Sequence, residues 1–267
     1  MIKLKSRLPN GLGILDEFVS LANLPDSGDP WRISALVPPS LDEGFLPAIE
    51  RIQEFNLKHA SSENGLAVID AIELKAPDDE HIAKASELVP ETIAAFLELP
   101  YADDPQELIK SIKGAPGNLF GKIRTGGVTP DQIPTADQVA RFIVRCAEQG
   151  LGFKATAGLH HPMRGAYRLT YEPEAQEGTM FGFLNVFLAA CLANSGVTDQ
   201  DVIAAILTES DSSAFEFEPS DIRWRQHTVS SEAIAESRSR FAFSFGSCSF
   251  DEPTSELRQL GLIRVLT

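Results

Sequence analysis

The sequence predicts a single α/β domain over residues 1–267, a (β/α)8 barrel of the TIM type in complete, distorted or incomplete form. Short apolar runs alternate with segments of helical period, which is typical of a parallel sheet built from right-handed βαβ units. The chain has 267 residues, close to the roughly 250 of a closed eight-stranded barrel. An open parallel α/β sheet is the alternative, although neither a Gly-rich dinucleotide fingerprint nor a P-loop is present.

The strands of this sheet are predicted from apolar runs. The runs are Trp31–Val37, Leu66–Leu74, Ile93–Leu99, Leu119–Thr125, Leu151–Gly158 and Phe241–Gly246. A further region, Ala214–Arg225, is rich in Phe, Ile and Trp and is expected to hold one or two more strands. Because only the first six runs are clear, the sequence leaves open whether the sheet closes into a barrel.

The helices are predicted from apolar periodicity and capping residues. The segments are Asp42–His59, Asp79–Leu88, Pro105–Lys113, Thr135–Gln149, Phe183–Asn194, Asp199–Glu209, Ser230–Arg240 and Thr254–Leu260. In the first of these, Leu46, Ile49, Ile52 and Phe55 are expected to form one buried face.

Leu12–Asn23, within a leading segment 1–30, is expected to form a helix that covers one end of the sheet. Residues 162–213 are interpreted as an insertion that forms a lid or an interface.

Charge and cysteine content restrict the partners and the compartment. The 23 basic residues against 38 acidic ones give a net charge of −15, which argues against nucleic acid and against an anionic membrane surface. The 3 cysteines are too few and too scattered for a disulfide framework, so reduced thiols and a cytoplasmic location are expected. The sequence leaves a homo-oligomer open.

Alternation along the strands predicts which side chains line the interior of the sheet. One face of a barrel strand packs on the helices and must be apolar, while the other can carry polar groups near the carboxyl end. Phe153 and Ala155 then face helices, and Asp70 is an exception on the outer face. In the last run, Ala242 and Ser244 are expected to share the inner face. The predicted interior set is Glu73, Glu98, Lys122, Arg124 and Lys154, with His160 or His161 just beyond.

Two lysine-bearing segments resemble a known family. Residues 122–161 contain K-I-R-T-G-G-V-T-P-D, A-D-Q-V and G-F-K-A-T-A-G-L-H-H, and residues 245–249 read F-G-S-C-S. This pattern resembles the paired lysine strands and the closing Gly-Ser turn of deoxyribose-phosphate aldolase, a class I aldolase with a barrel fold. The resemblance implies that Lys122 forms a Schiff base and that Lys154 tunes it. It also implies phosphate binding by Gly158 and the turn 246–249. Arg124 departs from the family, which has a small Ser there.

The residues themselves are consistent with lyase chemistry on a small anionic carbonyl compound without a cofactor. Lys154 and Arg124 would disfavour the ammonium form of Lys122, and Glu73 or Glu98 could move a proton during enolisation. The predicted anion-binding residues are Arg124, Gly158, His160, Gly246, Ser247 and Ser249.

Two further interpretations stay open at this point. Glu73, Glu98 and His160 could hold a divalent metal such as Mg²⁺ or Mn²⁺ for a metal-dependent lyase or isomerase. Alternatively, the basic residues and the Gly-Ser loop could bind a small anion without any catalysis.

Overall fold

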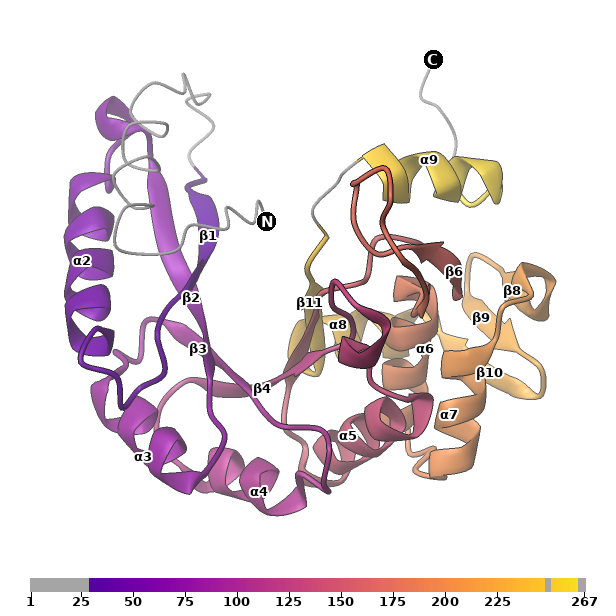
Figure 1. The fold of residues 1–267 in the computed structure, drawn as a ribbon, viewed down its shortest axis with the longest axis horizontal. Coiled ribbons are helices and arrows are strands. Elements are labelled where there is room, and N and C mark those ends of the chain that lie inside the picture. Colours follow the sequence, from indigo (N-terminus) through magenta and orange to yellow (C-terminus); the bar gives the residue numbers. More distant parts are fainter. Residues whose placement is uncertain (1–28, 248–250, 264–267) are drawn as a thin grey trace. The chain divides into compact units, whose positions relative to one another are not determined.

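The computed structural model describes residues 29–247 and 251–263. Figure 1 shows the order of elements. The elements are β1 (Trp31–Leu36), α2 (Phe45–Lys58), η1 (Ser62–Asn64), β2 (Ala67–Lys75), α3 (Asp79–Leu88), β3 (Ala94–Glu98), α4 (Gln106–Gly114), β4 (Leu119–Arg124), η2 (Pro130–Gln132), α5 (Ala136–Gln149), β5 (Phe153–Thr156), β6 (Gly165–Arg168), β7 (Glu177–Met180), α6 (Phe183–Asn194), α7 (Gln200–Thr208), η3 (Ser212–Ala214), β8 (Phe215–Phe217), β9 (Asp221–Trp224), β10 (His227–Ser230), α8 (Ser231–Arg240), β11 (Ala242–Phe245) and α9 (Asp251–Gln259). The expected leading helix Leu12–Asn23 lies outside the described residues.

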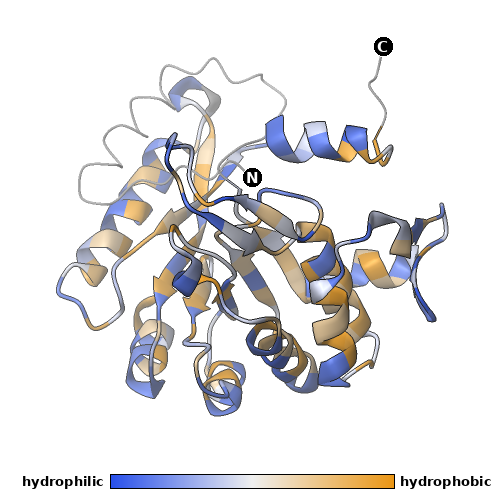
Figure 2. Cartoon of the chain, turned by 45° about the vertical axis from the view of Figure 1, so that its right-hand side comes forward, coloured by the Kyte–Doolittle hydropathy of each residue, from blue (hydrophilic) through white to orange (hydrophobic). Residues whose placement is uncertain are grey.

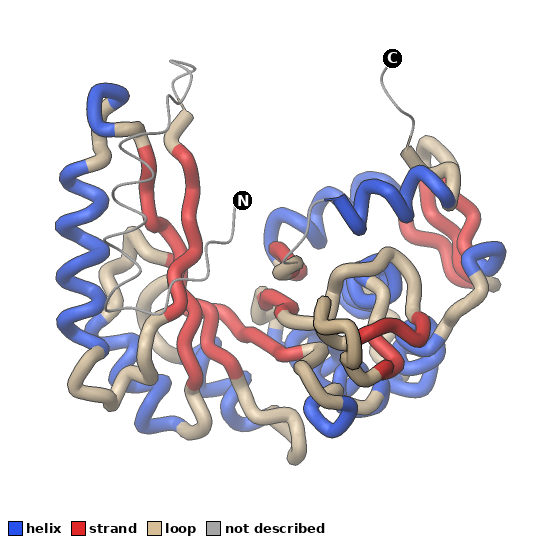
Figure 3. The backbone as a smooth tube through the Cα atoms, turned by 45° about the horizontal axis from the view of Figure 1, so that its top comes forward, coloured by secondary structure: helices blue, strands red, loops and turns tan. Residues whose placement is uncertain are grey.

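The predicted α/β fold with a parallel sheet is confirmed. The main sheet has six strands in the order β1-β2-β3-β4-β5-β11, and the pairs β1–β2, β2–β3, β4–β5 and β5–β11 are parallel. All six predicted runs supply these strands, which alternate with helices from β1 to β5 (Figure 3). Among the described residues β1 and β11 are the outermost strands, so these residues do not close an eight-stranded barrel.

The region Ala214–Arg225 forms two strands, as predicted, but they do not join the main sheet. β8 and β9 pair antiparallel, and β10 pairs antiparallel with β9. Only residues 218–220 connect β8 to β9, and residues 225–226 connect β9 to β10. A parallel crossover needs about a dozen residues or more, so these short connections permit only hairpins. The sequence prediction also missed β10 and the antiparallel hairpin of β6 and β7.

The described residues form two compact units. The first contains residues 29–99 and 111–120, and the second contains the remainder.

Hydrophilic and hydrophobic residues alternate around the helices that flank the strands (Figure 2), as expected where one helix face is buried. No described helix has the length and hydropathy needed to cross a membrane.

In the first unit, α2 packs its apolar face on β2. Ile49, Ile52 and Phe55 are buried as predicted, whereas Leu46 is 47% exposed. Phe45, which is fully buried, occupies the position four residues before Ile49 and takes the place that was predicted for Leu46. The helix is also tied to the strand by Asn56, whose amide donates to the carbonyl of Ile69 at 2.9 Å.

A β-bulge explains why Asp70 breaks the alternation of its strand. Ile33 pairs with Ile69, but the next residue, Ser34, pairs with Ala71, so Asp70 has no register partner on β1. An extra residue in one strand bends it and turns its side chain away from the regular pleat. The Asp70 carboxylate accepts a hydrogen bond from Arg32 in an ion pair, which places this acid outside the buried helix-facing layer.

In the second unit, α5 begins with a capping box and packs on β5. The Thr135 side chain accepts from the Gln138 N–H, and the Gln138 side chain accepts from the Thr135 N–H. This reciprocal pair satisfies two of the unpaired donors at a helix start. The inner face of α5 carries Phe142, whose ring meets that of Phe153 edge-on at 5.5 Å. α6 and α7, from the region 162–213, pack against α5 and against each other.

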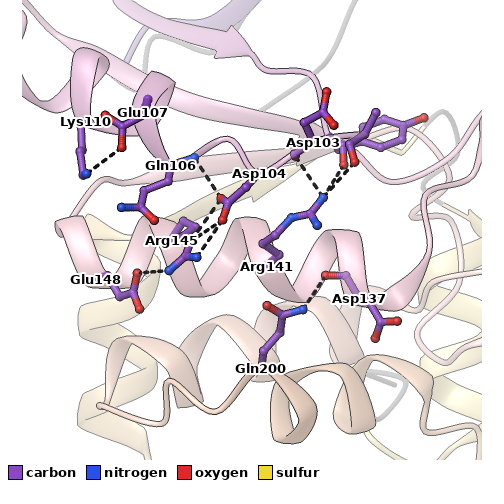
Figure 4. A network of polar contacts seen from close by, with 12 residues as sticks. Asp103, Asp104, Gln106, Glu107, Lys110, Asp137, Arg141, Arg145, Glu148 and Gln200 are labelled. Atoms are coloured by element: carbon purple, nitrogen blue, oxygen red, sulfur yellow. Dashed lines mark hydrogen bonds and ion pairs between the residues drawn. The ribbon is translucent and has the colours of Figure 1, made fainter.

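Two arginines of α5 fix the loop that follows β3 (Figure 4). The Arg145 guanidinium donates to both carboxylate oxygens of Asp104, the shortest contact being 2.7 Å, and to Glu148 at 3.0 Å. Arg141 donates to the backbone carbonyls of residues 101, 102 and 103 at 3.0 to 3.2 Å. These contacts join parts of the fold to one another, so the network is structural, although the buried Arg141 Nε has no hydrogen-bond partner among the described residues.

The Asp104→Asn variant is expected to lose stability only where the carboxylate is ionised. The Arg145 hydrogen bond lowers the pKa of Asp104. The contribution of this ion pair to the free energy of unfolding is therefore complete above a pH of about 3.9, the ordinary pKa of Asp. It is lost as the pH falls through the lower pKa of Asp104 in the folded state. Because both groups are partly exposed, we expect about 1 kcal/mol or less at pH 7 and no difference near pH 2, measured by urea unfolding.

The matched control is Asp103→Asn, since Asp103 contacts Arg141 through its backbone carbonyl. This variant is expected to unfold like the parent at both pH values. A deficit in Asp104→Asn that is equally large in acid would contradict the ion-pair explanation.

Candidate functional site

Two buried lysines lie opposite one another on neighbouring strands of the second unit. Lys122 of β4 is the register partner of Lys154 of β5, and they are 4% and 2% exposed. Paired residues of adjacent parallel strands project to the same side of a sheet, with backbones about 4.8 Å apart. The two amines were expected to lie close together if their strands were neighbours, and the register shows that the strands are neighbours.

The lysines occupy the face of the sheet opposite the helices. Ile123 and Ala155, which follow them in sequence, are register partners with 0% and 1% exposure. On that same helix-facing side, Phe153 packs on Phe142 of α5. Because side chains alternate along a strand, Lys122 and Lys154 project the other way. The predicted assignment of Phe153 and Ala155 to the helix side is therefore confirmed.

β11 adds a hydroxyl to the lysine row but departs from the predicted alternation. Ser244 is the register partner of Lys154, while Ala242 pairs with Phe153 on the helix side. The register shifts between them at Phe243, so the expectation that Ala242 and Ser244 share the inner face is wrong. The Phe243 side chain lies close against Gly152, since a Cβ on this glycine would be 2.4 Å from the Phe243 ring. An extra residue reverses the side to which all preceding side chains point.

The carboxyl ends of β4 and β5 meet backbone to backbone. The Thr125 hydroxyl, fully buried, donates to the Ala157 carbonyl at 2.7 Å. A Cβ on Gly126 would lie 2.7 Å from the Cα of Gly158. Gly158 has φ +72° and Ala157 has φ 64°, so the chain turns away from the strand here through two left-handed residues. This contact fixes the end of the strand that carries Lys154.

Gly158→Ala is expected to destabilise the second unit by about 1–2 kcal/mol, because a side chain is unfavourable at positive φ. Its Cβ would also press on the Gly126 Cα at 3.0 Å. The measurement is the urea midpoint. Gly114→Ala is the control, because a Cβ there meets nothing within 4 Å. Equal midpoints for Gly158→Ala and the parent would show that this turn tolerates a side chain.

The predicted anion-binding residues are distributed around these strand ends. The His160 ring nitrogen Nδ1 lies 3.2 Å from the Ser247 hydroxyl. The Gly246 N–H donates to the Ala155 carbonyl at 3.2 Å, so this amide extends the sheet and is already engaged. Arg124 is exposed at the end of β4, in register with Thr156. Ser249, also predicted to bind an anion, lies outside the described residues.

The two predicted acids belong to the first unit, whereas the lysines belong to the second. Glu73 of β2 is 1% exposed and accepts a hydrogen bond from the Ser34 hydroxyl at 3.0 Å. Glu98 of β3 is the register partner of Lys75. Since Glu73 pairs with Phe96, the two acids lie on the same face and are two register positions apart.

The metal set predicted as an alternative is not assembled by the described residues. Among residues 29–247 and 251–263, no group of three or more His, Cys, Asp or Glu side chains is arranged to hold a metal ion. Glu73 and Glu98 are in the first unit and His160 is in the second.

The sequence analysis missed the surroundings of His161. Its ring stacks on Tyr167 of β6 with centroids 3.4 Å apart, and its Nδ1 lies 2.7 Å from a carboxylate oxygen of Glu256 on α9. The available signal is the alternating run that contains Tyr167 and Leu169, but the sequence analysis interprets residues 162–213 as an insertion and assigns no strand there. No protein-family model and no curated protein sequence matches the chain.

Proposed function

We propose that the protein is a lyase of the aldolase type that acts on a small anionic carbonyl compound through a Schiff base on Lys122. The observation that carries this proposal is the register pair of buried lysines on the non-helical face of β4 and β5. Two lysines that are buried side by side repel one another when both are charged, and both lie near the carboxyl ends of their strands, where barrel enzymes place their active sites. A reaction that uses one neutral amine and one ammonium group gives the pair a purpose.

The proposed chemistry uses both lysines. The neutral amine of Lys122 attacks the carbonyl carbon, and the carbonyl oxygen takes a proton from the Lys154 ammonium. In the resulting carbinolamine a proton passes from the Lys122 nitrogen to the hydroxyl group, which leaves as water, and a protonated C=N bond to Lys122, the iminium, remains. The iminium nitrogen then accepts the electron pair of the C–C or C–H bond that breaks at the adjacent carbon.

The anionic group of the substrate is proposed to bind to the cationic and hydroxyl side chains at the strand ends. Arg124 is exposed, and His160 with Ser247 lies directly after β5 and β11. A guanidinium and a hydroxyl suit a carboxylate or phosphate group. The same groups also support the second candidate, a binding protein for a small anion that carries out no reaction.

We further propose that the main sheet belongs to a (β/α)8-type barrel. The support is the strand order, which follows the chain from β1 to β5 without reversal. In an open doubly wound sheet the order reverses at a switch point.

The described cysteines, Cys146 and Cys191, are free buried thiols, which supports a reducing compartment such as the cytoplasm.

Borohydride trapping tests the proposed function. The protein is incubated with pyruvate, dihydroxyacetone phosphate and glyceraldehyde 3-phosphate, reduced, digested and read by peptide mass. We expect a single adduct on Lys122, whose mass names the carbonyl partner. An adduct on Lys154 would reverse the two lysine roles. No adduct from folded protein, together with binding of phosphate or a carboxylate, would favour the non-catalytic candidate. Protein reduced without a carbonyl compound is the control.

A further inference from the structure

His161 is held in one orientation by three different elements of the second unit. Its backbone carbonyl accepts from the Phe183 N–H at 2.9 Å. One face of its ring lies on the ring of Tyr167, with an interplanar angle of 7°. Its Nδ1 meets the Glu256 carboxylate at 2.7 Å. The contact from α6 fixes the backbone of His161, and the contacts from β6 and α9 leave its imidazole little rotational freedom.

The contact with Glu256 decides which ring nitrogen of a neutral His161 is available. An ionised carboxylate only accepts hydrogen bonds, so Nδ1 must carry the proton that is shared with Glu256. The lone pair of the neutral ring is then on Nε2. A carboxylate that fixes the tautomer of a histidine in this way also stabilises the imidazolium that forms when Nε2 takes up a proton. The pair therefore has the arrangement of a general acid–base dyad.

The dyad lies at the strand ends that carry the lysine pair. The Phe183 ring, adjacent to the amide that holds His161, stacks on Phe245 with centroids 5.0 Å apart. Phe245 is the register partner of Ala155, the residue after Lys154. His160, the preceding residue, contacts Ser247 at the end of β11. These contacts fix His161 to the carboxyl edge of β5 and β11.

α9 is attached to this edge by polar contacts. None of its described side chains is buried, and most of the helix has the hydrophilic colours of Figure 2. Glu252 and Glu256 are four residues apart and so share one face of the helix. Glu252 accepts from the Tyr171 hydroxyl at 2.8 Å, while Glu256 contacts His161. The helix therefore offers two similar carboxylate contacts, only one of which involves the histidine.

We propose that His161 is the proton-transfer residue of this site and that Glu256 is the positioning residue that holds it. The inference rests on the proposed Schiff-base function. Nε2 of His161 removes a proton from the carbon adjacent to the iminium, the C–H electron pair forms the enamine, and the iminium nitrogen becomes neutral. The imidazolium, paired with Glu256, later returns the proton to that carbon. No further reactant is needed for this balance.

The test compares imine formation with proton exchange in the same samples. The probes are pyruvate and dihydroxyacetone phosphate in D2O, with loss of the carbon-bound proton followed by NMR and the imine trapped by borohydride. His161→Gln is expected to keep the Lys122 adduct while exchange slows by roughly 100-fold or more. Glu256→Gln is expected to slow exchange by about tenfold or more, with partial recovery in Glu256→Asp.

Glu252→Gln is the matched control, because it weakens the other carboxylate contact of the same helix. It is expected to leave exchange unchanged. Equal losses in Glu252→Gln and Glu256→Gln would assign the effect to attachment of α9 and overturn the role of Glu256. Unchanged exchange in His161→Gln with a normal adduct would overturn the role of His161 and leave the proposed function standing.

A measurement without substrate keeps the two proposals distinguishable. In nitrogen-15 spectra of the wild-type protein, recorded where the imidazole carries one proton, that proton is expected on Nδ1 of His161, and Glu256→Leu is expected to shift it toward Nε2. Absence of the Nδ1–H form would overturn the dyad. A normal tautomer with no trapped adduct in the wild type would refute the Schiff-base function, and with it the proton-transfer role.

Discussion

Replacing Lys122 by Met is expected to abolish the borohydride-trapped adduct and to lower turnover by at least about a thousandfold. Methionine has no amine to attack a carbonyl, but it keeps a long apolar stem that can fill the same buried position. Lys122→Arg is expected to be equally inactive, because a guanidinium stays protonated and forms no imine. Turnover that survives in either variant would exclude Lys122 as the nucleophile.

Lys154→Met separates the two lysine roles. Its register places it beside Lys122, so we expect the adduct to form on Lys122 more slowly and turnover to fall. Lys110→Met is the matched control, since Lys110 is a partly exposed lysine of α4 that pairs with Glu107 at 2.8 Å. It is expected to behave like the parent. Urea midpoints close to that of the parent would show that the losses are chemical.

Asn185→Ala is expected to cost about 3 kcal/mol or more of unfolding free energy. The Asn185 side chain is fully buried. Its carbonyl accepts from the Arg164 N–H at 3.0 Å, and its amide donates to the carbonyls of Ile206 and Glu209, each at 2.8 Å. The truncation removes this partner from three backbone groups, of which the Ile206 carbonyl keeps a hydrogen bond from the Glu209 N–H at 3.3 Å. Each buried group left unpaired costs about 1–3 kcal/mol.

The position of Asn185 explains why one amide matters so much. It ties α6 to the carboxyl end of α7, where backbone carbonyls lack helical partners, and to the segment that leads into β6. The packing leaves no room nearby, because a Cβ on Gly182 would lie 2.4 Å from the Asn185 amide oxygen. Asn194→Ala, at the exposed end of the same helix, is the control and is expected to change stability by less than about 0.5 kcal/mol. A similarly small loss in Asn185→Ala would contradict this account.

Local signals predicted most of the elements. The α3 and α6 bounds agree with the predicted ranges, and all six strands of the main sheet were found. The predicted elements have strong local causes, such as the Thr135 capping box of α5 and the apolar runs of β2 and β5. The lysine pair was also accessible, because alternation places Lys122 and Lys154 on inner faces and a βαβ unit makes their strands neighbours.

The errors came where a partner strand decides the outcome. The bulges at Asp70 and Phe243 exist only relative to the strands beside them, so alternation within a single strand could not reveal them. The strands of Ala214–Arg225 were recognised, but their sheet was not, since their short connections make hairpins instead of crossovers.

The sequence by itself determined the α/β class, the parallel sheet and the lysine-bearing faces, because periodicity and capping act over a few residues. Only the tertiary structure decided which distant side chains meet. His161 and Glu256 are 95 residues apart in the chain, and Asn185 reaches the end of α7 from the interior of α6. Such contacts depend on how whole elements pack, and no local pattern encodes them.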